Sequence, residues 1–128
     1  MLLEISETVK PIISDPNIRM VVLYRIDGTP ILAEIKDKNI KILDLLYRLE
    51  NQIKDILYHI FSGDLDDISF KFRDIVVKMY PVSRTLVLAI LAKEETSIYK
   101  LEADIESVCM KIKELVGYEH LDSLHTVQ

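Results

Sequence analysis

Residues 20–35 read MVVLYRIDGTPILAEI, two apolar runs on either side of a polar turn. Asp27-Gly28 between such runs is the strongest short-range signal of a β-hairpin, because glycine tolerates a positive φ and aspartate bonds its own backbone. Pro30 lacks a backbone N–H, so the second strand is expected to begin at an edge or first-residue position. Strands are expected over 18–25 and 30–36. Nothing in this hairpin is chemically reactive, so it indicates an architecture and not a reaction.

The composition is that of one soluble domain. The chain has 128 residues, 49% of them hydrophobic and 29% charged, which is enough for one core. Its longest apolar run, 86–92, is far shorter than the roughly 20 residues of a membrane span, and Glu4 and Glu7 stand where a secretory signal would be basic. The single cysteine, Cys109, excludes an internal disulfide and indicates a reducing compartment, so a cytoplasmic location is expected. A net charge of −5 argues against a nucleic-acid binder.

The longest helix signal covers residues 40–61, with Asn39 as a plausible N-cap and Gly63 as the C′ residue. Its apolar residues form two adjacent stripes, Ile42, Leu46, Leu49, Ile53, Ile56 and Ile60 in one, and Leu43, Tyr47, Leu57 and Phe61 in the other. This arc is wider than packing one face on a sheet requires. The helix is therefore either buried on two sides within one copy or docked on a second copy.

Narrower apolar stripes predict a helix near each end of the chain. The first, Leu2, Ile5, Val9 and Ile12, is expected to lose regular helix near Val9 or Lys10, because Pro11 fits poorly inside a helix. The last helix is expected over 94–116, solvated on its outer face and capped by Gly117. Its stripe consists of Ile98, Leu101, Ile105, Val108, Ile112 and Leu115.

Three further strands complete the predicted sheet. Apolar and polar residues alternate over 68–72, and apolar runs cover 75–82 and 85–92 with a turn at Ser83-Arg84. The strands at 18–25 and 85–92 are apolar on both faces and are expected to be central. The order αββαβββα predicts an α+β fold, a three-layer α/β/α sandwich with a five-stranded antiparallel sheet. Residues 1–117 would form this domain, followed by a polar tail over 118–128.

This order of elements, with residues 21–31 reading VVLYRIDGTPI, resembles the roadblock/dynein light chain family, a profilin-like type of sandwich, over roughly residues 2–116. Residues 34–37 depart from the family pattern, because they are charged where the family has small residues. The resemblance implies a homodimer in which two middle helices pack together and the following strand pairs with its copy. The contacts would be Leu45, Leu46, Leu49, Ile53 and Ile56 on the helix, and Ile68, Phe70 and Phe72 on the strand.

The resemblance also implies a partner. Members of the family bind small Ras-like GTPases or scaffold motor and signalling complexes, without a catalytic residue or cofactor that could be carried over to this chain. With three glycines and no Gly-x-x-x-x-Gly-Lys-Ser/Thr motif, no phosphate-binding loop is expected, so the partner would hold any GTP. Two alternatives remain open. One is a PAS/profilin-like ligand sensor with a small molecule near Tyr47, Phe70 and Phe72, and the other is a longin-like trafficking subunit that pairs with a different chain.

The remaining reactive residue types favour structural roles, and no metal site is predicted. His120 and His125 lie in the polar tail, five residues apart, a poor helical spacing for shared ligation. The acidic cluster of Asp64, Asp66 and Asp67 lacks the spacing and closing glutamate of a calcium loop. Cys109 falls beside the apolar stripe of the last helix, which favours core packing over a nucleophile. His59 is expected on the polar side of the middle helix.

Overall fold

The computed structural model describes residues 2–36, 54–56, 58–59, 68–72 and 74–118. Predictions for Asn39, Gly63, the acidic cluster at 64–67 and the tail from 119 onward lie outside these residues. In chain order, the described elements are α1 (Leu2–Thr8), α2 (Lys10–Ile13), β1 (Ile18–Arg25), β2 (Pro30–Ile35), β3 (Ile68–Phe72), β4 (Ile75–Pro81), β5 (Leu86–Ala92), α4 (Glu95–Lys100) and α5 (Glu102–Tyr118).

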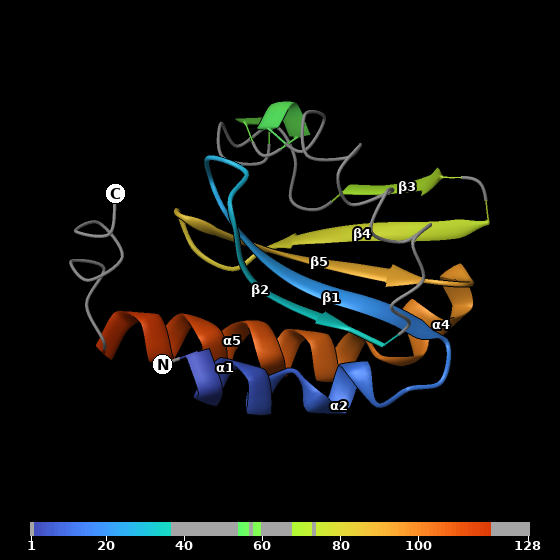
Figure 1. Cartoon of the computed structure of the whole chain (residues 1–128), viewed down its shortest axis with the longest axis horizontal. Helices are drawn as coiled ribbons and strands as arrows, with labels where there is room; N and C mark the ends of the chain where they lie inside the picture. Colours follow the sequence, from blue (N-terminus) through green and yellow to red (C-terminus); the bar gives the residue numbers. More distant parts are fainter. Residues whose placement is uncertain (1, 37–53, 57, 60–67, 73, 119–128) are drawn as a thin grey trace.

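The five strands form one antiparallel sheet in the order β2-β1-β5-β4-β3, as Figure 1 shows. The predicted sheet and the interior positions of β1 and β5 are therefore confirmed, and every residue of β5 is buried. β4 and β5 are each one residue shorter than predicted at the turn that joins them. There the Ser83 hydroxyl accepts a hydrogen bond from the Thr85 N–H, and the Val82 N–H donates to the Leu86 carbonyl.

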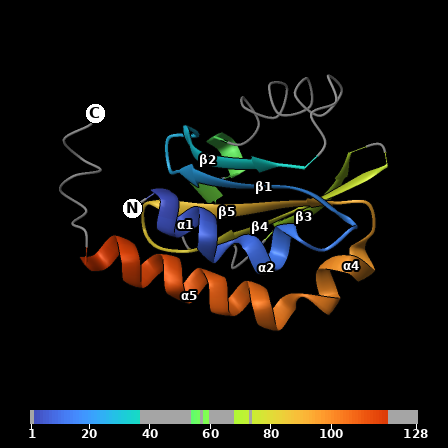
Figure 2. The same ribbon diagram turned by 60° about the horizontal axis from the view of Figure 1, so that its bottom comes forward.

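The four helices near the chain ends lie on one face of the sheet (Figure 2). Side chains alternate along a strand, so β1 sends Ile18, Val21 and Leu23 into this layer, with a register shift between Ile18 and Met20. Each fully buried aliphatic side chain stabilises the fold by about 1.5–3 kcal/mol. The helical residues of this core are Ile5, Val9, Ile12, Ile98, Leu101, Ile105, Val108, Ile112 and Val116.

The N-terminal helical region is interrupted near the predicted position. α1 ends at Thr8, but α2 begins at Lys10 with Pro11 in its first turn. A proline is tolerated there because the first helical N–H groups need no partner within the helix. Ile5, Val9 and Ile12 all remain buried in the core across this interruption.

The predicted single last helix is wrong, because the chain turns at Leu101 between α4 and α5. The Leu101 N–H donates to the Ile98 carbonyl at 3.0 Å, the tight spacing of a 3₁₀ turn, and both side chains remain buried. Gly117 does not cap the helix as predicted, since α5 continues to Tyr118. Among the described glycines only Gly28 has the positive φ that a left-handed glycine cap requires.

The opposite face of the sheet carries a second apolar cluster made of Met20, Val22, Tyr24, Val77, Met79, Val87, Ala89 and Leu91. Ile56, from the short described part of the middle helix, packs against this cluster together with Ile68 and Phe70 of β3. This is the face on which the sequence predicts a third layer, and the layer itself stays a prediction. No helix in the described ranges is long and apolar enough to cross a membrane.

Candidate interaction surfaces

β3 forms one edge of the sheet. It pairs with β4 from Ile68 opposite Met79 to Phe72 opposite Ile75, and no strand within the described residues lies on its other side. An edge strand presents a row of backbone N–H and C=O groups that can pair with another strand. Ser69 and Lys71 are exposed on one face of β3, and Ile68 and Phe70 are half-buried on the other. Within the described residues, both the backbone and an apolar flank of this edge are therefore left open to a partner.

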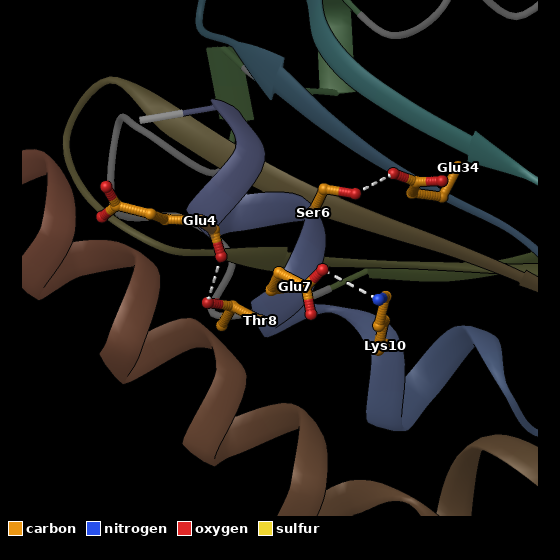
Figure 3. A network of polar contacts seen from close by, with 6 residues as sticks. All are labelled: Glu4, Ser6, Glu7, Thr8, Lys10 and Glu34. Atoms are coloured by element: carbon orange, nitrogen blue, oxygen red, sulfur yellow. Dashed lines mark hydrogen bonds and ion pairs between the residues drawn. The ribbon is translucent and has the colours of Figure 1, made fainter.

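The opposite edge, β2, is engaged by polar contacts within the chain. The Ser6 hydroxyl of α1 donates to the Glu34 carboxylate of β2 (Figure 3). The Lys36 ammonium donates to the Asp15 carbonyl just beyond the end of β2. Charged residues on an edge strand disfavour pairing with another strand. The charged segment that departs from the roadblock pattern thus distinguishes this edge from β3.

The predicted dimer contacts differ in how much of each the structure describes. Ile56, Ile68 and Phe70 come together against the second cluster, and all three keep part of their surface exposed. The backbone of Phe72 pairs with Ile75, and its side chain is not among those described. The remaining contacts predicted on the middle helix, Leu45, Leu46, Leu49 and Ile53, lie outside the described residues.

The turn residues singled out in the sequence lie together at the β1–β2 tip. Asp27 accepts a hydrogen bond from the Thr29 N–H at 2.9 Å, and Arg25 Nη2 lies 2.6 Å from Asp27 Oδ2. The Arg25 hydrogen bond, with a smaller contribution from the Thr29 N–H, lowers the pKa of the Asp27 carboxyl to about 2. Gly28 has φ +87°, and Pro30 opens β2 opposite Tyr24. These contacts link the polar side chains of the tip to one another and to its backbone.

A groove of about 720 Å³ runs between the end of β4 and α5. Lys78 stands beside it, with Nζ 3.3 Å from Glu102 Oε1 and 5.2 and 5.4 Å from the ring centroids of Tyr80 and Tyr99. A cation over two aromatic faces holds β4 against α4 and α5. The residues that line the groove are Tyr80, Pro81, Val82, Glu102, Ala103, Ile105, Glu106, Cys109, Met110 and Lys113.

The groove is not among the features that the sequence predicts, because the charged residues of the last helix indicate a uniformly solvated outer face. The signal available in the sequence was Met110, an apolar residue among charged ones, and its side chain is indeed 65% exposed. A long apolar side chain left in water beside a hollow is a feature of interaction surfaces.

The structure also gives the surroundings of the cysteine and histidine side chains in the described part of the chain. Cys109 is partly buried, and this burial is the main reason that the pKa of its thiol is raised to about 11. The nearby Glu106 carboxylate adds to the effect. At neutral pH it is therefore a thiol and not a thiolate nucleophile. His59 is exposed and makes an edge contact with the Tyr58 ring at 5.8 Å. No group of three or more His, Cys, Asp or Glu side chains among the described residues is placed to hold a metal ion.

One protein family matches the sequence of this chain, and several solved structures have a similar fold. The AF0774-like protein family matches residues 2–106. Curated protein sequences yield no match. MglB from Myxococcus xanthus is a similar solved structure, with 15% identity, a TM-score of 0.70 and coverage of 90% of this chain and 96% of that one.

Two further structures share the fold. A roadblock/LC7 domain from Streptomyces avermitilis has 14% identity and a TM-score of 0.59, covering 91% of this chain and 97% of that one. A structure described as MglB with a tetrameric arrangement has 7% identity and a TM-score of 0.70, covering 91% and 90%. At such identities the similarity shows the fold alone. The roadblock resemblance drawn from the sequence is confirmed at that level.

Proposed function

Because the chain belongs to the AF0774-like protein family and has the fold of roadblock domains, we propose that it is a non-enzymatic homodimer that scaffolds or regulates a small Ras-like GTPase. The observation that carries this proposal is the β3 edge, which no other described strand covers, flanked by the half-buried Ile56, Ile68 and Phe70. These surfaces, rather than the fold alone, support the proposed role, because one fold can carry many functions.

Dimerisation would use β3 and the middle helix together. Two β3 strands related by a two-fold axis would extend the sheet across both copies, since such an interface places the same patch on each subunit. The apolar residues predicted on the middle helix, Leu45, Leu46, Leu49 and Ile53, would then meet their counterparts. The polar contacts at β2 favour β3 as the pairing edge. One structure of similar fold is described as MglB with a tetrameric arrangement, which supports the proposal that this chain self-associates.

The GTPase would supply the nucleotide site, and this chain would supply a binding surface. The three glycines of the chain and the absence of a phosphate-binding motif support this division of roles. The two-fold symmetric dimer would present equivalent surfaces on both copies. Any effect on GTP hydrolysis would then come from ordering the catalytic elements of the partner.

Light scattering coupled to size-exclusion chromatography tests the dimer directly. A mass near 29.6 kDa, twice the 14.8 kDa chain, is expected. Leu46→Glu and Leu49→Glu should each shift the mass to 14.8 kDa, because they place a charge in an apolar interface. His59→Glu, at an exposed position of the same predicted helix, is the matched control and should leave the dimer intact. An unchanged dimer in both leucine variants would show that Leu46 and Leu49 do not lie in the dimer interface.

The GTPase half of the proposal needs a separate assay. Candidate small GTPases loaded with a non-hydrolysable GTP analogue are titrated with the wild-type dimer by calorimetry, and their GTP hydrolysis rates are measured with and without it. Binding that is lost in Leu49→Glu but kept in His59→Glu would support the proposal. If the wild-type chain is a 14.8 kDa monomer that binds no GTPase, the ligand-sensor and heterodimer alternatives take precedence.

A further inference from the structure

Asp27-Gly28, the pair of residues at the hairpin tip, is chemically reactive as well as a turn signal. It is the one Asp-Gly pair in the sequence, which contains no Asn-Gly pair. Because glycine has no Cβ, nothing hinders its backbone nitrogen from attacking the carboxyl carbon of the preceding aspartate. The product of this attack is a five-membered succinimide ring.

The reaction needs only water as a co-reactant. Gly28 N forms a bond with Asp27 Cγ, and the bond from Cγ to one carboxyl oxygen breaks. This oxygen leaves as water with the amide proton and the carboxyl proton. A water molecule then opens the ring at either carbonyl carbon. Opening at the former side-chain carbonyl restores aspartate, and opening at the former main-chain carbonyl gives isoaspartate.

The atoms that the cyclisation uses are held in hydrogen bonds at the tip. The Gly28 N–H, whose proton must leave, donates to the Arg25 carbonyl at 2.9 Å. Asp27 Oδ1 accepts the Thr29 N–H at 2.9 Å, and Oδ2 lies 2.6 Å from Arg25 Nη2. Ring closure must break the first of these bonds and at least one of the other two. The tip therefore has to open locally before it reacts.

Arg25 also keeps the carboxyl in its less reactive form. A carboxylate is a poorer electrophile than a carboxylic acid, since its negative charge opposes attack and it lacks the proton that leaves with the oxygen. The Arg25 hydrogen bond is the main cause of the lowered pKa of Asp27, about 2, so the acid form is scarce at neutral pH. The Arg25 side chain is only 18% exposed, so solvent screens this ion pair less than a fully exposed one.

Further contacts tie the tip to the rest of the fold. The Ile26 N–H donates to the Thr85 carbonyl at 2.9 Å, which joins the tip to the turn between β4 and β5. The Lys54 side chain lies against Gly28. Opening the tip therefore disturbs contacts with two other parts of the chain.

We propose that Asp27-Gly28 is a site of spontaneous isoaspartate formation, and that Arg25 is the residue that protects it in the folded hairpin. Isoaspartate leads the main chain through the side-chain Cβ and adds one backbone atom between Asp27 and Gly28. The added atom would disturb the Thr29 hydrogen bond and the pairing of Pro30 with Tyr24. The modification would thus loosen the start of β2, and it requires no second copy and no GTPase.

Incubation of the full chain at neutral pH tests this proposal. Endoproteinase Asp-N cleaves before aspartate but not before isoaspartate, so mass spectrometry of the digest measures the modified fraction at position 27. Isoaspartate should form at least about tenfold more slowly in the folded wild type than in the same chain unfolded in guanidinium, because the tip must open first. Equal rates in the two states would overturn the proposal.

Substitutions of Arg25 test its protective role. Arg25→Met removes the charge and the side-chain bonds to Asp27, and should speed the folded-state reaction by about fivefold. Arg25→Lys keeps a positive charge and should react at an intermediate rate. The matched control is Arg84→Met, at an exposed arginine in the turn between β4 and β5, which should leave the rate unchanged.

Circular dichroism at the incubation temperature establishes that each variant is folded. If Arg25→Met is unfolded, the comparison of Arg25→Lys with Arg84→Met decides the outcome. A folded Arg25 variant that reacts no faster than Arg84→Met would show that Arg25 does not protect the site.

Discussion

Gly28 at the hairpin tip lies directly against the side chain of Lys54: a Cβ added to Gly28 would come within 3.1 Å of Lys54 Cγ. Gly28 also has φ +87°, so glycine is required there both by the backbone conformation and by the close approach of the lysine stem. The contact joins residues 26 positions apart, and it fixes the β1–β2 tip against the middle helix. Lys54 thereby covers a turn whose residues were recognisable from local sequence alone.

Gly28→Ala should destabilise the protein by about 1–2 kcal/mol, because it adds left-handed backbone strain and a clash with Lys54. The free energy of unfolding is measured by urea denaturation. Gly117→Ala is the matched control, since its added Cβ meets open space within a helix, and it should stabilise the fold by about 0.5–1 kcal/mol. Equal effects of the two substitutions would contradict the assigned role of Gly28.

Asp27 should make folding stability sensitive to acid. Its pKa is lowered from 3.8 to about 2 in the folded protein, chiefly by the Arg25 hydrogen bond. A carboxylate with a depressed folded pKa contributes stability that is present above pH 4 and is lost as the pH falls toward 2. Asp27→Asn should therefore show a smaller loss of stability between pH 4 and pH 2 than the wild type. Urea midpoints across this range provide the measurement, with Asp104→Asn on α5 as the control.

Lys78 should contribute to the attachment of α4 and α5 to β4. Lys78→Ala removes the stem, the Glu102 ion pair and two aromatic contacts, and is expected to cost about 1–2 kcal/mol. Lys78→Met keeps most of the aliphatic stem and should lose less. Lys100→Ala, an exposed lysine of α4, should change the thermal midpoint little. If Lys78→Ala behaves like Lys100→Ala, the lysine does not hold these elements together.

Cys109 should resist alkylation in the folded protein. A pKa of about 11 against an ordinary value of 9.0 lowers the thiolate fraction at pH 8 by about a hundredfold. Iodoacetamide labelling, followed by mass spectrometry, should accordingly be slower by about that factor than in guanidinium-unfolded protein. Glu106→Gln should speed the folded-state reaction modestly, because the carboxylate helps to raise the thiol pKa. Comparable folded and unfolded rates would rule out this environment.

The strands whose positions depend on residues adjacent in the sequence were predicted closely. β1 spans Ile18–Arg25 as expected, because Asp27-Gly28 is a turn signal that depends on the conformational preferences of a few adjacent residues. β3 likewise appears at Ile68–Phe72, where apolar and polar residues alternate. The central position of β5 also followed from its apolar continuity, since a strand covered on both faces leaves no place for polar side chains.

Only the tertiary structure decided the features that depend on contacts between distant residues. The turn at Leu101 allows both Ile98 and Leu101 to pack in the core. The ion pair between Lys78 and Glu102 forms only because α5 lies beside β4. The exposure of Met110 beside the groove has the same origin, because a local pattern defines a helix face but not the surface opposite it. The sequence by itself thus determined the five strands and their order along the chain, but not the division of the last helix into α4 and α5. The tertiary packing decided which faces of those elements remain available to a partner, because availability depends on everything that packs around them.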